Sequence, residues 1–294
     1  MKKIYLQIAS LLSTAALLTA FGFLTFFLID RPETLPEASV PLPDDETENP
    51  TPETDGTAPP DYDEPTQDDT SDEDPAPDPQ KRGSEYIRSK VDGLSIRSGP
   101  GTSYSVLGSL DKNDMVTYLG KSGNWYITEY KRTTAYVSAG TSYSEIYSMD
   151  HDVDENVETV IAEGYRLLGY PYVYGAVRLH DGKGNFLKNF DKTKYDCSSL
   201  TQYMYYEGAG VQLDVTTRTQ VKQGTYVAKS DLKRGDLMFF TNSSRYNNTG
   251  TERIGHVAVY LGGNYILHTA SDHAVIEPIS TQRWNYYIES RRVL

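Results

Sequence analysis

A proline-rich acidic stretch limits where this chain can fold. Residues 30–82 hold 12 of the 15 prolines, and residues 31–80 hold 17 Asp and Glu side chains against a single Arg. Such a segment cannot bury enough apolar surface to offset the entropy of ordering it. We predict an extended, disordered linker over residues 31–82, which at ~3.1 Å per residue reaches up to ~150 Å.

An apolar segment precedes the linker. Residues 4–29 contain no charged side chain and consist mainly of Leu, Phe, Ala and Ile. A helix of this length measures roughly 39 Å, enough to cross a hydrocarbon core of about 30 Å. Lys2 and Lys3 before it favour a cytoplasmic N-terminus. We predict a transmembrane signal anchor over residues 1–30, with the rest of the chain outside the cell membrane. A cleaved signal peptide, and hence secretion, is the alternative.

The charge of the chain is concentrated in the linker. Residues 83–294 contain 23 acidic and 23 basic side chains, although the whole chain carries a net charge of −13. A nucleic-acid-binding domain normally shows a basic patch or stripe, and this sequence has none. Nucleic acid is therefore excluded as an expected partner.

Short strand-like runs recur about every ten residues in the segment 83–145. Turn residues such as Ser98-Gly99-Pro100-Gly101 separate them. Regularly spaced short strands are typical of a small β-barrel. The runs lie at Leu94–Arg97, Val106–Leu107, Met115–Leu119, Trp125–Ile127 and Ala135–Val137.

The segment 150–294 shows helical patterns first and strands afterwards. Apolar residues at helical spacing predict a helix over Val153–Leu168, and a second helix begins at Cys197 and ends at Gly208 or Gly210. The expected strands are Asp236–Phe240, Gly255–Leu261, Tyr265–His268 and a short one near Val275–Ile276. This order predicts the α+β class, with helices packed on an antiparallel sheet.

Cys197 is the only cysteine, so an intramolecular disulfide is excluded. It lies in the first turn of the second helix, which Asp196 or Ser198 can cap. There the unpaired N–H groups and the helix dipole predict a lowered thiol pKa and a site for an oxyanion. A lone cysteine is more often an inert buried side chain, and thiol chemistry also needs a base.

His256 and His268 flank a hairpin-turn sequence, Leu261–Tyr265. A three-residue loop over Gly262–Asn264 would place Ala258 opposite His268 and put both histidines on one face. A hydrogen bond between the two rings would then fix the tautomer of His256. A zinc site that adds His273 matches no known ligand spacing, so we predict no metal and no organic cofactor.

Five ordered blocks resemble the NlpC-type, papain-like cell-wall cysteine peptidase family. They are Tyr172–Ala176, Asp196–Leu200, Arg234–Phe240, Gly255–Gly262 and Ile266–His268. This resemblance implies a papain-like peptidase domain over 150–294 that cleaves peptidoglycan stem peptides, typically between D-γ-glutamyl and the diamino acid. Gly93–Pro100, with Gly123–Tyr126 and Ala135–Val137, is similar to a bacterial SH3-type domain, which implies binding of cell-wall peptide or a place beside a hydrolase site.

The same resemblance implies roles for single residues. It makes Cys197 the nucleophile, His256 the base and acid, and His268 the orienting residue. Tyr172 corresponds to a tyrosine beside the nucleophile, and Asp196 to an acid that in some members binds the free amine of the stem peptide. Ser198 is the third expected substrate contact.

The chain departs from the family pattern without losing a catalytic atom. It has Tyr174-Gly175-Ala176 where Trp-Gly-Gly is usual, and Ser199 where Gly is usual. Thr241–Arg253 reads as an additional loop. Arg218, near a family Arg-Thr block, is expected to be structural.

We therefore expect a membrane-anchored, outward-facing cysteine endopeptidase that acts on peptidoglycan stem peptides. Three alternatives remain at this point. They are an N-acetylmuramoyl-L-alanine amidase on the same scaffold, a thiol acyltransferase, and a non-catalytic wall-binding protein. No oligomeric state is predicted.

Overall fold

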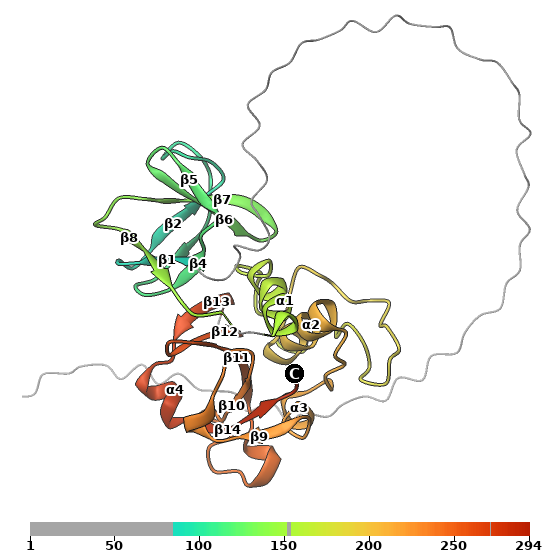
Figure 1. Ribbon diagram of the computed structural model, residues 1–294. Coiled ribbons are helices and arrows are strands. Elements are labelled where there is room, and N and C mark those ends of the chain that lie inside the picture. The colour runs from blue at the N-terminus through green and yellow to red at the C-terminus, as the bar shows by residue number, and fades with distance from the viewer. Residues whose placement is uncertain (1–84, 152–153, 271) are drawn as a thin grey trace, which may run out of the picture. The chain divides into compact units, whose positions relative to one another are not determined.

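The structure, a computed structural model, describes residues 85–151, 154–270 and 272–294 (Figure 1). The predicted signal anchor and linker lie outside these residues. Within the described ranges, no helix is long and apolar enough to span a membrane.

Eight short strands come first in the described chain, and they include the five predicted ones. Strands β1, β5 and β8 were not predicted from the sequence. In β2, Leu94 and Ile96 are buried while Ser95 and Arg97 are partly exposed, which is the alternation expected of a half-buried strand. The strands are β1 (Glu85–Ser89), β2 (Leu94–Arg97), β3 (Val106–Leu110), β4 (Met115–Thr117), β5 (Gly120–Ser122), β6 (Trp125–Tyr130), β7 (Thr133–Ser138) and β8 (Ser144–Ser148).

The C-terminal domain confirms the predicted α+β class. Helix α1 (Glu155–Tyr165) packs against α2 (Cys197–Ala209), and α2 packs on strands β11 and β12 (Figure 1). Its strands are β9 (Thr225–Val227), β10 (Leu237–Phe240), β11 (His256–Gly262), β12 (Tyr265–Ala270), β13 (His273–Pro278) and β14 (Tyr287–Arg292). Short helical turns complete it: α3 (Thr217–Gln220), η2 (Lys229–Asp231), η3 (Gly250–Arg253) and α4 (Thr281–Asn285).

One antiparallel sheet contains strands from both domains. Its order is β8-β1-β4-β13-β12-β11-β10-β14-β9, and the remaining strands form a second sheet, β3-β2-β7-β6-β5. The two domains meet where Met115 on β4 pairs with Ile276 on β13. The SH3-like strands therefore extend the sheet that carries both histidines, an arrangement that was not predicted.

A buried arginine adds a polar connection between the domains. Arg234 Nη2 donates to the hydroxyls of Tyr86 on β1, at 3.1 Å, and Tyr165 on α1, at 2.7 Å. Arg234 Nε lies 2.6 Å from Glu158 Oε1. A buried guanidinium is tolerated only when its charge is paired and its donors are used, and this network meets both needs.

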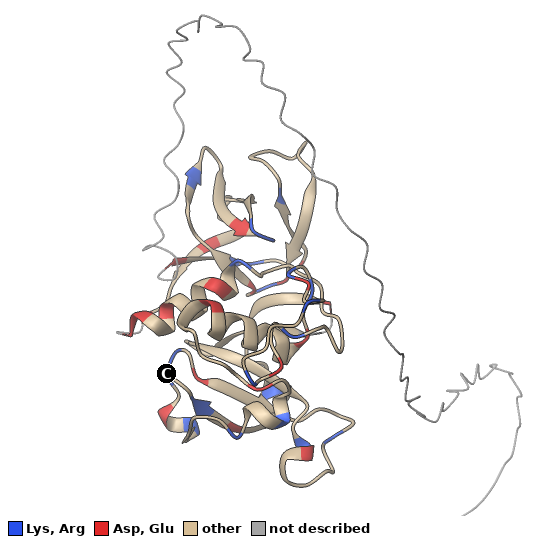
Figure 2. Ribbon diagram, turned by 90° about the vertical axis from the view of Figure 1, so that its right-hand side faces the viewer, with Lys and Arg blue, Asp and Glu red and all other residues tan. Residues whose placement is uncertain are grey.

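Charges of both signs are spread over the described chain. Figure 2 shows Lys and Arg interspersed with Asp and Glu on strands, helices and loops rather than gathered in one stripe. This distribution agrees with the neutral balance counted for residues 83–294.

Candidate active site

Cys197 is placed by the cap of its own helix. The Asp196 carboxylate accepts from the Ser199 N–H at 2.8 Å, and the Asp196 N–H donates to Ser199 Oγ at 2.8 Å. This reciprocal pair starts α2 at Cys197, as predicted. The thiol is 8% exposed, and the backbone N–H groups of Ser198 and Val257 hydrogen-bond to its sulfur. Helix α2 thus brings the sulfur next to the first residues of β11.

The predicted lowering of the thiol pKa is wrong for this structure. Burial, followed by the charge of the Asp196 carboxylate, raises the pKa of Cys197 to about 12. The N–H groups of Val257 and Ser198 and the Arg178 guanidinium act in the opposite direction but are outweighed. A helix N-terminus lowers a thiol pKa only if its effect is larger than the opposite effect of desolvation. Here the residue that caps the helix is itself an anion, which also opposes ionisation of the thiol.

The hairpin between β11 and β12 brings the histidines together in the predicted register. Val259 pairs with Leu267 and Tyr260 with Ile266, so the register sets Ala258 opposite His268. The turn itself is Gly263–Asn264 with a bulge beside it, instead of the predicted three-residue loop. The bulge supplies the extra residue that keeps both rings on one face. His256 Nε2 lies 2.8 Å from His268 Nδ1.

A glutamate on the third strand extends this pair. His268 Nε2 lies 3.0 Å from Glu277 Oε1, and Arg283 Nη2 donates to the same oxygen at 2.9 Å. Burial alone would raise the pKa of Glu277, but the hydrogen bonds and charges of His268 and Arg283 lower it to about 2. At neutral pH, Glu277 is therefore an ionised acceptor.

The ionised Glu277 determines the tautomers of both histidines. Because a carboxylate only accepts, His268 Nε2 carries the proton between them. His268 Nδ1 is then an acceptor, so His256 donates from Nε2 and keeps a lone pair on Nδ1. Hydrogen bonds through a second group commonly fix a catalytic imidazole in this way. His256 is left with a free basic nitrogen.

Both rings are neutral at rest. Burial, His268 and Arg283 lower the pKa of His256 well below its ordinary value, and burial is also the main cause that lowers the pKa of His268. A neutral imidazole next to a protonated thiol can act as a general base when the thiol attacks. The arrangement suits nucleophilic catalysis with proton transfer at the moment of attack, rather than a stored thiolate.

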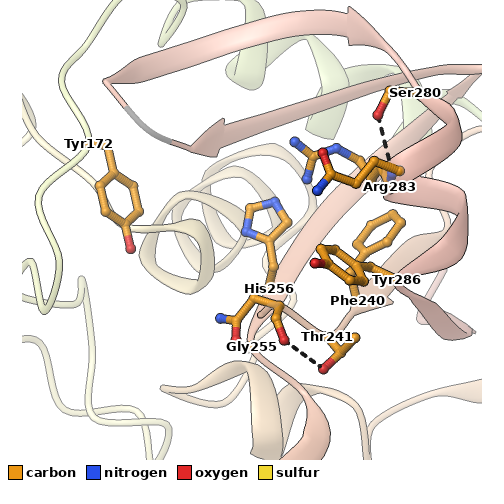
Figure 3. Close-up of a pocket in the computed structure, with 10 residues that line it drawn as sticks. Tyr172, Phe240, Thr241, Gly255, His256, Ser280, Arg283 and Tyr286 are labelled. Carbon is orange, nitrogen blue, oxygen red and sulfur yellow. Dashed lines mark hydrogen bonds between the residues drawn. The ribbon is translucent and has the colours of Figure 1, made fainter. Parts of the chain in front are cut away.

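Two cavities that share part of their lining adjoin the site. One, of about 360 Å³, is lined by Cys197, and the other, of about 340 Å³, by His256; we call them the thiol-side and the imidazole-side cavity. They share Tyr172, Asn242 and Gly255. Figure 3 shows the His256 ring facing the imidazole-side cavity, with Tyr172 on one side and Phe240, Arg283 and Tyr286 on the other. The thiol and the imidazole therefore line two neighbouring cavities, one each.

The three predicted substrate contacts all line the thiol-side cavity. Burial, followed by the charge of Cys197, raises the pKa of Tyr172 to about 12, so this hydroxyl can donate a hydrogen bond. Asp196 pairs with Arg178 at 2.7 Å, and Ser198 Oγ donates to Asp196 Oδ1 at 3.2 Å. Asp196 and Ser198 thus already have internal partners, and binding of substrate by these residues stays a prediction.

Sequence reasoning missed Glu277 and Arg283. The signal for Glu277 was the hairpin between β12 and β13, in which Ala270 pairs with His273 and His268 with Val275. A two-residue turn in this sequence would have placed Glu277 on the same face as His268. Apart from this register, nothing in the sequence Glu277-Pro278 distinguishes it from the end of any other strand.

Among the described residues, no group of three His, Cys, Asp or Glu side chains is arranged to hold a metal ion.

The candidate site lies within a part of the chain that matches a known family. The model of the NlpC/P60 family matches residues 169–293, and that of the bacterial SH3 domain matches residues 92–143. Residues 169–293 belong to the NlpC/P60 family. The match contains the thiol, both imidazoles, Glu277 and all residues that line the two cavities.

The relatives of this NlpC/P60 domain are longer proteins. Over 148 residues the chain is 33% identical to the peptidoglycan DL-endopeptidase CwlO of Bacillus licheniformis, covering 48% of this chain and 29% of the relative. Over 126 residues it is 29% identical to the gamma-DL-glutamyl hydrolase of Bacillus subtilis, covering 42% and 26%. A solved NLP/P60-family structure from Staphylococcus aureus is 29% identical, with a TM-score of 0.39, and covers 50% of this chain and 43% of that one. The chain therefore spans less than a third of the length of these two curated relatives.

Proposed function

We propose that this protein is a cysteine endopeptidase that cleaves peptidoglycan stem peptides between D-γ-glutamyl and the diamino acid. The observation that carries the proposal is the continuous hydrogen-bonded series from His256 to His268 to Glu277, next to the only cysteine of the chain. The two relatives described above are named for hydrolysis of peptidoglycan and of γ-glutamyl bonds, which supports the choice of substrate.

The first half of the reaction follows from the neutral pair. The Cys197 sulfur attacks the isopeptide carbonyl while its proton moves to His256 Nδ1. The carbonyl oxygen becomes an oxyanion, which N–H groups at the start of α2 can stabilise. His256, now protonated, gives this proton to the leaving amine, and the carbon–nitrogen bond breaks. A thioester remains on Cys197, and the diamino acid leaves with a free amine.

The second half returns the enzyme to its resting state. Neutral His256 accepts a proton from water as the water attacks the thioester. The carbon–sulfur bond breaks, a carboxylic acid is released, and His256 returns its proton to the sulfur. Throughout, His268 and Glu277 hold the ring in one tautomer and stabilise its positive charge.

The location of the enzyme belongs to the same proposal. The apolar segment 4–29 and the charges of Lys2 and Lys3 support a membrane anchor with an extracytoplasmic catalytic domain. The acidic, proline-rich linker would then hold that domain away from the membrane. The SH3 domain would engage wall peptide or glycan near the site of cleavage.

Mass spectrometry of a defined stem peptide tests the function. Incubation of L-Ala-γ-D-Glu-diaminopimelate with the protein should yield L-Ala-D-Glu and free diaminopimelate. Cys197→Ala and His256→Ala are the matched inactive controls. Release of lactyl-linked glycan from muropeptides without cleavage of this peptide would point to an amidase, and equal products from all three proteins would end the enzyme proposal.

A further inference from the structure

In the proposed reaction, the two cavities receive opposite sides of the scissile bond. In the proposed function, on which this inference rests, His256 protonates the leaving amine, so the leaving diamino acid lies in the imidazole-side cavity. The acyl group stays bound to sulfur and must occupy the thiol-side cavity. In this reaction, the residues that line the thiol-side cavity therefore contact the γ-glutamyl residue.

The thiol-side cavity is rich in arginine. Arg178, Arg218 and Arg245 line it, and Asp196 is the acidic residue among its described lining. The guanidinium of Arg178 already has partners within the protein, because it pairs with Asp196 and donates to the carbonyl of Val215 at 2.8 Å and to Ser198 Oγ at 3.0 Å. This leaves Arg218 and Arg245 as the cations that a ligand can reach.

An exposed glutamate bridges these two arginines. Glu252 Oε1 lies 3.4 Å from Arg218 Nε, and Glu252 Oε2 lies 3.3 Å from Arg245 Nη1. The Glu252 side chain is 65% exposed, against 34% for Arg218 and 27% for Arg245. Exposed pairs of this length contribute little to stability. The carboxylate is thus held loosely, where another carboxylate can replace it.

The additional loop brings the two guanidinium groups together. Arg218 lies on α3, and both Arg245 and Glu252 belong to the loop Thr241–Arg253. A carboxylate is the natural ligand of a pair of guanidinium groups, which donate in a fork geometry. In a γ-glutamyl bond, the α-carboxylate of the same residue is free and ionised, and it lies on the acyl side of the scissile carbonyl.

We propose that Arg218 and Arg245 bind the free α-carboxylate of the γ-glutamyl residue, in place of Glu252. The enzyme then prefers stem peptides with γ-D-glutamate over those in which this carboxylate is amidated to isoglutamine. The amide is neutral and cannot form charge-assisted hydrogen bonds to the two guanidinium groups, so it does not compensate them for the loss of Glu252.

Two peptides that differ only in this group provide the test. They are L-Ala-γ-D-Glu-diaminopimelate and the same peptide with an α-carboxamide. With the full-length protein, amidation should reduce kcat/KM about tenfold to hundredfold, the range of a charge-assisted contact. The double variant Arg218→Gln/Arg245→Gln should lose a similar factor on the carboxylate peptide and keep its rate on the amide peptide.

Binding separates this inference from the proposed function. Calorimetry with Cys197→Ala measures the Kd of both peptides without turnover, and a tenfold or larger preference for the carboxylate is expected even if the wild type cleaves neither. Arg166→Gln, at a surface pair with Glu163, is the matched control and should leave the preference unchanged. Equal affinity and equal rates for the two peptides would overturn the inference, as would a double variant that loses both peptides to the same extent.

Discussion

The thiol and the imidazole of this site are held in two different ways. Cys197 is positioned by residues next to it in the sequence, through the cap that Asp196 and Ser199 form. His256 is positioned by three strands, through His268 on β12 and Glu277 on β13. The helix cap can be predicted from a short stretch of sequence. The arrangement around His256 depends instead on the registers of two hairpins. The residues that position the nucleophile are thus close to it in the sequence, whereas those that position its base are distant from it.

The largest expected effect tests whether the thiol of Cys197 and the imidazole of His256 act as one catalytic unit. Cys197→Ala and His256→Ala should each reduce kcat by about 10⁴-fold or more, and the double variant should be no worse than either, because residues of one catalytic unit are strongly non-additive. Single-turnover assays on the stem peptide measure this. If the two losses multiplied, the thiol and the imidazole would be working separately.

The next effect concerns only the support that His268 and Glu277 give to His256. Glu277→Gln keeps the shape of the side chain but removes its charge, so the tautomers of His268 and His256 are no longer fixed and the positive charge on His256 is less stabilised. We expect kcat to fall about 10-fold to 100-fold with little change in KM. Glu289→Gln on β14, which pairs with Arg291, is the control. A Glu277→Gln enzyme with full kcat would reduce the glutamate to a packing residue.

The environment of the Cys197 thiol can be probed by alkylation, because Cys197 is the only thiol of the chain. With its pKa raised to about 12, the thiol stays protonated at neutral pH, and the iodoacetamide rate should climb about tenfold per pH unit through pH 9 without a plateau. Asp196→Asn still caps the helix but removes the nearby anion, so the pKa falls and the rate at pH 7 should rise about threefold to tenfold.

Asp191→Asn is the matched control for the alkylation experiment, since this carboxylate is bound within its own turn by Thr193. Its alkylation rate should equal that of the wild type. A plateau near pH 6 in the wild-type profile would instead reveal a stored thiolate paired with protonated His256.

The smallest effect concerns the SH3 domain, whose strand β4 adjoins β13. Tyr86→Phe removes a hydroxyl that is bound to Tyr165 and Arg234, and should lower the free energy of unfolding by about 1 kcal/mol. Denaturant titration measures the loss. Because the thiol is held locally, the alkylation rate of Cys197 should not change; a change would show that the domain contact also positions the nucleophile.

The parts that the sequence predicted are those with local causes. Turn residues and alternation located most strands, the acid before Cys197 located the start of α2, and the Gly-Gly-Asn turn located the histidine hairpin. The raised thiol pKa was not predictable, because it depends on how deeply α2 and β11 bury the sulfur. Glu277 required a second register, and the pairing of β4 with β13 joins residues more than a hundred positions apart.

The protonated resting state of Cys197 also bears on oxidative damage. Peroxide reacts with thiolates, and the first product, a sulfenic acid, can be oxidised further to forms that do not recover. A thiol that ionises only as substrate takes its place is largely hidden from such oxidants. The burial that makes this sulfur a slow nucleophile at rest therefore also preserves it, in a chain with no second cysteine to repair it through a disulfide.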